Sequence, residues 1–212
     1  MEGSFNMESH LEAAGGGVDW EARYQTGDTP WDKGAAHPAL LERLARNPLS
    51  GDVLVPGCGA GHDARAISAN GARKVVGLDI APAALNRAHA FPNPPGLEFR
   101  LEDFLARREP QAFDALFEHT CLCAIPPDRR LDYLEAAGRC LRNGGLFLGV
   151  LFTNPDNPAN DAPPFRCRLD EMKALFSQTF EILEIRHGIP TFPERENREV
   201  WVEMQKRSRG NA

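Results

Sequence analysis

The chain has 212 residues, 42% of them hydrophobic and 25% charged, which is typical of one globular domain with a sizeable core. This composition excludes disorder, collagen and a coiled coil as descriptions of the whole chain. Lys and Arg number 24 against 30 Asp and Glu, for a formal net charge of −6, and no dense basic run is present, so nucleic acid is not an expected partner.

Cysteine and histidine usage points away from disulfides and metals. The five cysteines contain no CxxC pair, and the six histidines show no i, i+3 or i, i+4 spacing on a helix. We therefore expect buried thiols and no bound metal.

The termini and apolar runs predict a cytoplasmic protein. The longest strongly apolar run, residues 146–152, is too short to cross a bilayer, and residues 1–17 lack the features of a signal peptide. We expect a flexible tail over residues 1–17 and one domain over 18–212. No exposed apolar heptad suggests an obligate assembly, so a monomer is expected.

From residue 18 onward, short apolar runs alternate with amphipathic stretches, which predicts a parallel sheet covered by helices. The last two expected strands, FEILEI and EVWVEMQ, have no helix between them and should be antiparallel neighbours. The predicted fold is a doubly wound, Rossmann-like α/β sheet with a C-terminal antiparallel β-hairpin. The earlier expected elements are, in chain order, a helix at 37–46, a strand at 52–56, a helix at 63–69, a strand at 74–79, a helix from 82, strands at 97–101 and 113–119, a helix at 128–142, a strand at 145–152 and a helix from 169.

A glycine-rich turn follows the first expected strand. The sequence VLVPGCGAG places Gly57, Gly59 and Gly61 between strand and helix, where glycine lets a ligand approach the backbone closely. Asp79 ends the next strand and can accept hydrogen bonds from ribose hydroxyls, with Ile80 beside it. An adenosine-containing cofactor is expected here, and a tight turn without a ligand is the alternative.

Two cofactors fit this turn. A dinucleotide fingerprint GxGxxG/A counted from Gly57 would need Gly or Ala at position 62, where the chain has His62. The observed GxGxG spacing resembles motif I of S-adenosylmethionine-dependent methyltransferases. Asp103 follows the third strand, where such enzymes meet the adenine amino group, and a helix cap is its alternative role.

Three of the five Trp and Tyr residues lie in one segment, DWEARYQTGDTPWDKG. Trp20 and Tyr24 share a helix face at i, i+4, and Trp31 follows a turn. Packing on the core is one interpretation of these aromatics. The other is a lid for a sulfonium cofactor, because aromatic faces attract cations.

The motifs WEARYQTGDTPWDKG, VLVPGCGAGHDA, VVGLDIAP, CAIPP and APPFR together closely resemble the thiopurine S-methyltransferase superfamily, and within it the plant-type halide and thiol methyltransferases. The resemblance implies a class I methyltransferase fold, S-adenosylmethionine as cofactor, S-adenosylhomocysteine as product and an N-terminal lid over residues 18–36. The cofactor-binding residues that it implies, together with the glycine-turn and strand-end candidates, are Trp20, Tyr24, Trp31, Gly57, Gly59, Asp79, Ile80, Asp103, Phe104 and Glu118.

The acceptor side is less determined. The resemblance places Glu118–Cys123 at the methyl-transfer centre and makes Trp31 and Phe165 candidate pocket walls, but plant enzymes often have Tyr where this chain has His119. We hypothesise that His119 is a base or orienting group for a thiol; a strand-end histidine held by hydrogen bonds is the alternative. Arg195 can attract an anion or simply be solvated.

The expected reaction is in-line methyl transfer to a small soft nucleophile: a thiol, hydrosulfide, thiocyanate or halide. Thiopurines and selenium or tellurium species are alternative acceptors. An NAD(P)-dependent oxidoreductase and a non-catalytic cofactor-binding module are alternatives of other classes.

Overall fold

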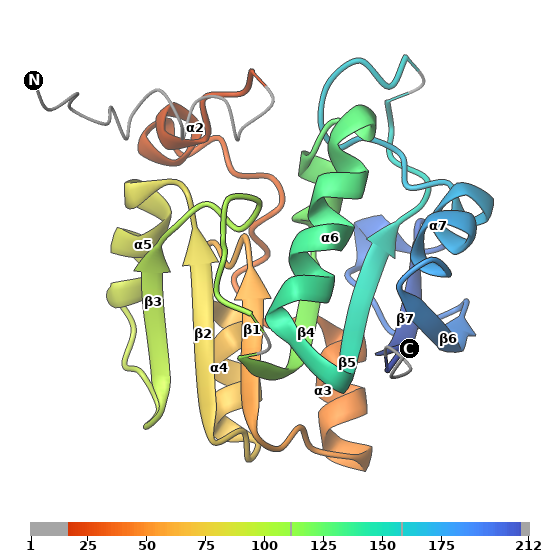
Figure 1. Ribbon diagram of the computed structural model, residues 1–212. Coiled ribbons are helices and arrows are strands. Elements are labelled where there is room, and N and C mark those ends of the chain that lie inside the picture. The colour runs from red at the N-terminus through yellow and green to blue at the C-terminus, as the bar shows by residue number, and fades with distance from the viewer. Residues whose placement is uncertain (1–16, 111, 158, 209–212) are drawn as a thin grey trace, which may run out of the picture.

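Seven strands form one sheet in the order β3-β2-β1-β4-β5-β7-β6 in the computed structural model, which describes residues 17–110, 112–157 and 159–208 (Figure 1). Strands β1 to β5 run parallel, whereas β7 is antiparallel to both β5 and β6. The strands are β1 (Asp52–Pro56), β2 (Lys74–Asp79), β3 (Leu97–Leu101), β4 (Phe113–His119), β5 (Leu141–Phe152), β6 (Phe180–Arg186) and β7 (Glu199–Lys206).

Helices cover both faces of the sheet, and α2 lies beyond the carboxyl ends of the strands (Figure 1). Pro stands in the first turn of α3 and of α5, where its missing N–H costs no helical hydrogen bond. The helices are α2 (Trp20–Thr26), α3 (Pro38–Arg46), α4 (His62–Ala69), α5 (Pro82–His89), α6 (Arg130–Cys140) and α7 (Leu169–Phe176), with short 3-10 turns η1 (Leu122–Ala124), η2 (Pro127–Arg129) and η3 (Pro193–Arg195).

Alternation along the strands creates two separate cores. In β1, Leu54 packs with the cluster under α6 and α7, whereas Val53 and Val55 pack with the cluster under α3 and α4. Successive strand side chains point to opposite faces, so a strand apolar at every position must be buried on both. The apolar run in β1 therefore requires helices on each side of the sheet.

The predicted fold class is confirmed, including the terminal antiparallel pair. The expected helix over 128–142 ends instead at Cys140, because Leu141 already pairs with Phe113 of β4 and belongs to β5. Most of the tail predicted over residues 1–17 lies outside the described residues. Within the described ranges, no helix is long and apolar enough to cross a membrane.

The doubly buried β1 makes a stability prediction. Leu54→Ala should lower the free energy of unfolding by about 2–5 kcal/mol in urea denaturation, since Leu54 is fully buried and its truncation leaves a cavity. Leu183→Ala is the matched control, because Leu183 lies in β6 and is 50% exposed. We expect a change within about 0.5 kcal/mol for the control. Equal losses in the two variants would contradict the two-core description.

Candidate functional site

A cavity of about 420 Å³ opens at the carboxyl ends of the parallel strands. This is the edge at which doubly wound sheets bind ligands. The residues that line it come from α2 and the segment after it, the glycine turn, the ends of β2 and β3, the turn after β4 with η1, the end of β5 and the loop that follows it, and η3 with the residues after it. They are Trp20, Arg23, Tyr24, Pro30, Trp31, Lys33, Gly57, Leu78, Asp79, Ile80, Glu102, Asp103, Phe104, Leu105, Thr120, Cys121, Cys123, Ala124, Ile125, Phe152, Asp156, Pro163, Pro164, Glu194, Arg195 and Arg198.

The glycine turn is packed tightly on two sides. Gly57 has φ +58°, and a Cβ there would lie 2.9 Å from Cys121 Sγ. Gly59 has φ +52°, and a Cβ there would lie 2.8 Å from the hydroxyl oxygen of Tyr24. Both the left-handed backbone and the missing space demand glycine at these positions. The turn after β4 and helix α2 can therefore pack directly on the backbone between β1 and α4.

Asp79, the last residue of β2, stabilises the same turn by hydrogen bonds. Its carboxylate accepts hydrogen bonds from the backbone N–H of Gly59, at 2.9 Å, and of Ala81, at 3.0 Å. Burial raises the pKa of Asp79, and these N–H donors only partly oppose that effect. Asp79 thus joins the glycine turn to the end of β2 and also lines the cavity.

The aromatic segment is docked by hydrogen bonds and ring contacts. Trp31 Nε1 donates to the Tyr24 hydroxyl at 2.9 Å, and the two rings meet edge to face with centroids 5.5 Å apart. Glu21 accepts from the backbone N–H of Ala83 at 2.8 Å, and Arg87 donates to the carbonyl of Tyr24, so α2 is fixed to α5.

These aromatic rings already hold cations. The Arg23 guanidinium lies 4.5 Å from the centroid of Trp31 and 5.8 Å from that of Trp20, and Arg87 lies 5.3 Å from Tyr24. Tyr24 is packed in a buried cluster with Ala81 and Ala84, and the three aromatic residues also line the cavity. The segment is therefore both core packing and cavity wall, and its role as a lid for a sulfonium cofactor stays a prediction.

The turn after β4 is held by a buried carboxylate. Glu118 accepts from the backbone N–H of Leu122 at 2.8 Å and from the Tyr133 hydroxyl of α6. Burial raises the pKa of Glu118 to about 6. Thr120, two residues on, lines the cavity and adopts a left-handed φ of 64°, which a β-branched residue rarely adopts.

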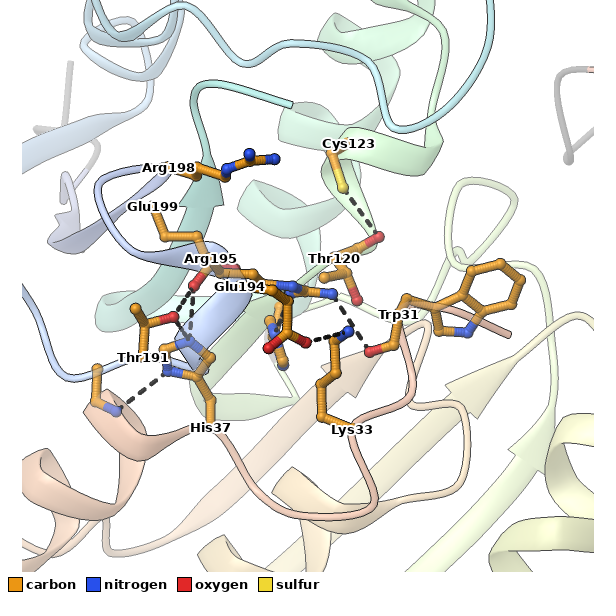
Figure 2. Close-up of polar contacts among 12 residues, drawn as sticks. Trp31, Lys33, His37, Thr120, Cys123, Thr191, Glu194, Arg195, Arg198 and Glu199 are labelled. Carbon is orange, nitrogen blue, oxygen red and sulfur yellow. Dashed lines mark hydrogen bonds and ion pairs between the residues drawn. The ribbon is translucent and has the colours of Figure 1, made fainter. Parts of the chain in front are cut away.

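A buried polar cluster lies behind this turn (Figure 2). Glu199, the first residue of β7, accepts from Arg195 Nη1 at 2.9 Å and contacts His37 Nε2 at 3.0 Å. His119 contacts Asp63 through Nδ1 at 2.7 Å and Arg195 Nη1 through Nε2 at 3.3 Å. Two histidine–carboxylate pairs thus meet at one guanidinium.

Hydrogen bonding fixes the tautomer of both histidines. The backbone N–H of Ala39 donates to His37 Nδ1 at 3.1 Å, so the proton of neutral His37 is on Nε2 and is donated to Glu199. Arginine can only donate, so His119 Nε2 accepts and its Nδ1–H is donated to Asp63. Burial raises the pKa of Asp63, but the interactions with His119 and the hydrogen bond from the backbone N–H of His37 together outweigh burial and hold that pKa below its ordinary value.

The ligating atoms of His37, His119 and Glu199 lie within 4.8 Å of one another, a spacing that could hold a metal ion. The cluster instead contains a cation of its own, since Arg195 Nη1 contacts both Glu199 and His119. A metal bound to His37 Nε2 would also have to displace the proton that this atom donates to Glu199. The donor set is therefore a poor fit for a metal, and the expectation that none is bound stays a prediction.

The structure gathers most of the predicted site residues in one place. Phe165 and Glu118 are buried behind the cavity wall, and Gly59 and His119 contact lining residues without lining the cavity themselves. The base role of His119 stays a prediction. Those that line the cavity are Trp20, Tyr24, Trp31, Gly57, Asp79, Ile80, Asp103 and Phe104.

Sequence reasoning gave no role to His37 or Glu199, and left Arg195 open between an anion site and solvent. Arg195 is only 6% exposed. Its guanidinium is paired with Glu199, four positions further along the chain. Glu199 is in turn held by His37, which lies 158 positions before Arg195. For His37, the only sequence signal was the proline that follows it, which marks a helix start.

Comparisons with known proteins agree with this geometry. The family model described as thiopurine S-methyltransferase matches residues 17–208. A probable thiol methyltransferase 2 of Arabidopsis thaliana is 33% identical over 191 residues, covering 87% of this chain and 83% of its own. Thiocyanate methyltransferase 1 of the same plant is 30% identical over 194 residues, covering 87% and 84%.

A solved structure of similar fold contains the cofactor product. The Burkholderia thailandensis 1,6-didemethyltoxoflavin-N1-methyltransferase, with bound 1,6-didemethyltoxoflavin and S-adenosylhomocysteine, superposes with a TM-score of 0.70. It is 20% identical and covers 98% of this chain and 93% of its own. This likeness supports the class I methyltransferase fold.

The buried Glu118 predicts a pH effect on stability. Its folded pKa of about 6 exceeds the ordinary 4.5, so its contribution to the free energy of unfolding is fully present below pH 4.5 and is lost as pH rises through 6. We measure the free energy of unfolding by urea titration at pH 4.5 and at pH 7.5. Between these two values the unmodified protein should lose on the order of 2 kcal/mol more of this free energy than Glu118→Gln does. The exposed Glu181→Gln provides the control. A difference independent of pH would contradict the assignment.

Proposed function

The chain belongs to the thiopurine S-methyltransferase family and is an S-adenosylmethionine-dependent methyltransferase, and we propose that its acceptor is a small anionic nucleophile: a thiolate, hydrosulfide, thiocyanate or halide. The observation that carries this proposal is a mostly apolar cavity with the buried guanidinium of Arg195 in its wall. The family resolves the choice of cofactor left open by the glycine turn, in favour of the sulfonium.

The glycine turn fits the cofactor by shape and by charge. Gly57 leaves backbone open to the cavity, Asp79 offers a buried carboxylate to ribose hydroxyls, and Asp103 with Phe104 lies where the adenine would be held. When bound, S-adenosylmethionine supplies an electrophilic methyl group on a positively charged sulfur. Trp31 borders the same cavity and would separate that group from bulk water.

The cavity wall would strip water from an incoming anion. Phe152, Cys121, Cys123 and Trp31 present mainly apolar surface near the turn after β4. A desolvated soft anion held in line with the sulfonium needs little further catalysis, because the transition state loses charge. Arg195 would attract such an anion and partly replace its hydration shell.

The enzyme's own thiols would not compete as acceptors. Burial raises the pKa of Cys121 and of Cys123 well above the ordinary value, and the nearby charge of Glu118 raises both further. The thiolate is the nucleophilic form, so protonated cysteines beside the reaction centre are poor methyl acceptors. This arrangement suits a cavity meant for a nucleophile that arrives already ionised.

A neutral thiol would need to lose its proton. His119 is the proposed base from the sequence, but its ring nitrogens contact Asp63 and Arg195, so the guanidinium lies between His119 and the cavity. This arrangement favours acceptors that are already anions in solution and need no base to remove a proton. Thiocyanate and iodide belong to that class, and hydrosulfide is partly ionised near neutral pH.

Thiopurines and oxidised selenium or tellurium species stay as alternative acceptors within the same cavity. The proposal also includes a monomer acting in the cytoplasm on a small molecule, with no nucleic-acid partner. The net charge of −6 supports the last of these points, the absence of a nucleic-acid partner.

Asp79→Asn should weaken cofactor binding. One amide N–H₂ would replace an oxygen that accepts from Gly59 or Ala81 and would remove the charge offered to the ribose. We expect the Kd of S-adenosylhomocysteine in calorimetry to rise about ten- to a hundredfold, the value of a hydrogen bond to a charged group. Asp52→Asn, at the opposite end of β1, is the control. Unchanged affinity at position 79 would remove Asp79 from the cofactor site.

The acceptor is tested by supplying S-adenosylmethionine with iodide, thiocyanate, hydrosulfide, a thiopurine and selenite separately. Methylated products are measured in the headspace or by liquid chromatography. We expect kcat/KM for at least one small anion to exceed that for the thiopurine by tenfold or more, about 1.4 kcal/mol of transition-state binding. Turnover of the thiopurine or selenite alone would instead establish one of the alternative acceptors.

A further inference from the structure

The charge of Arg195 is held in place by contacts with other side chains and with one backbone carbonyl, that of Trp31. Arg195 is the last residue of η3, a 3-10 helix of three residues, and it is 6% exposed. A buried charge is costly unless it is paired and hydrogen-bonded. The direction in which Arg195 faces the cavity therefore depends on the groups that contact its guanidinium.

Glu199 is the principal of these groups. Its Oε1 accepts from Arg195 Nη1 at 2.9 Å, and its Oε2 is held by His37 at 3.0 Å and by the Thr191 hydroxyl (Figure 2). Burial raises the pKa of Glu199, but the hydrogen bonds from His37 and Thr191 outweigh this effect and hold it at about 2. The carboxylate is thus ionised and immobilised, with one oxygen given to Arg195.

His37 orients that carboxylate without adding charge. It is the N-cap of α3, is fully buried, and accepts from Ala39 N through Nδ1. Its Nε2–H is consequently committed to Glu199. His37 also follows the aromatic segment in sequence, and the carbonyl of Trp31 accepts from Arg195 Nη2 at 3.4 Å.

A second support comes from β4 and α4. His119 Nε2 contacts Arg195 Nη1 at 3.3 Å, and Asp63 joins His119 to the backbone N–H of His37, at 2.7 Å in each case. The Phe152 ring lies 5.3 Å from the guanidinium carbon of Arg195. Contacts on several sides leave one orientation for the planar guanidinium.

We propose that His37 and Glu199 are positioning residues for the acceptor: the buried pair fixes the Arg195 guanidinium at the cavity wall, where it binds the anion that receives the methyl group. This inference rests on the proposed function, since it takes the acceptor to be an anion. Neither His37 nor Glu199 lines the cavity, so both act through Arg195.

The test uses His37→Asn in the full chain. Asn can still cap α3 by accepting from Ala39 N, but its side chain is too short to reach Glu199, and the substitution leaves the charge unchanged. The measurement is the Kd of thiocyanate for the complex with S-adenosylhomocysteine, by calorimetry, so that no turnover is required. His187→Asn, at an exposed position, is the matched control.

We expect Arg195→Gln and His37→Asn each to raise the Kd of thiocyanate about tenfold, the scale of one charge-assisted hydrogen bond. In the Arg195→Gln background, His37→Asn should change the Kd of thiocyanate by less than about twofold, because His37 acts on the anion only through Arg195. The Kd of S-adenosylhomocysteine should stay within about twofold in every variant. If His37→Asn does not fold, Thr191→Val takes its place in the same cycle.

Three results would overturn the inference. Equal weakening by His37→Asn in both backgrounds would mean that it acts independently of Arg195. If Arg195→Gln weakens thiocyanate binding but His37→Asn does not, Arg195 would still bind the anion, and His37 and Glu199 would not be its positioning residues. No effect of Arg195→Gln would remove the anion from this wall, whereas methyl transfer to small anions is decided separately by the acceptor panel.

Discussion

Gly57 and Gly59, in the turn between β1 and α4, have no room for a side chain, and the rest of the site is built on that constraint. Cys121, from the turn after β4, occupies the space beside Gly57, and the Tyr24 hydroxyl occupies the space beside Gly59. The acceptor-side turn and the aromatic segment are thus packed on the same few backbone atoms. A side chain at either glycine would separate them, because close packing transmits small changes in volume.

Buried charges at the site are handled in two ways. Asp79 and Glu118 have few cationic neighbours, so burial raises the pKa of each and their stabilising partners are mainly N–H and hydroxyl donors. Glu199 has His37, Thr191 and Arg195 around it, and its pKa falls to about 2. The first arrangement leaves negative charge available near the cofactor edge. The second holds the positive charge of Arg195 at the cavity wall, which suits the proposed anionic acceptor.

The residues with local signals were predictable. Strand alternation, the GxGxG turn and the helix starts at proline depend on neighbours within a few positions, and they predicted the sheet and the part of the cavity wall formed by Gly57 and Asp79. Family resemblance added the choice of a sulfonium cofactor. The predicted end of α6 was wrong because Leu141 pairs with Phe113 in the sheet. These two residues lie 28 positions apart in the sequence, so local pattern does not show the contact.

Short-range pattern in the sequence determined the fold class and an adenosine-containing cofactor as the expected ligand of the glycine turn, and resemblance to a family narrowed that cofactor to S-adenosylmethionine. Only the tertiary structure decided which charges meet. His37, Asp63, His119 and Glu199 come from four different elements and carry no common motif, yet they converge on Arg195. Their effect depends on desolvation and on hydrogen-bond geometry between distant segments, and both quantities exist only once the chain has folded.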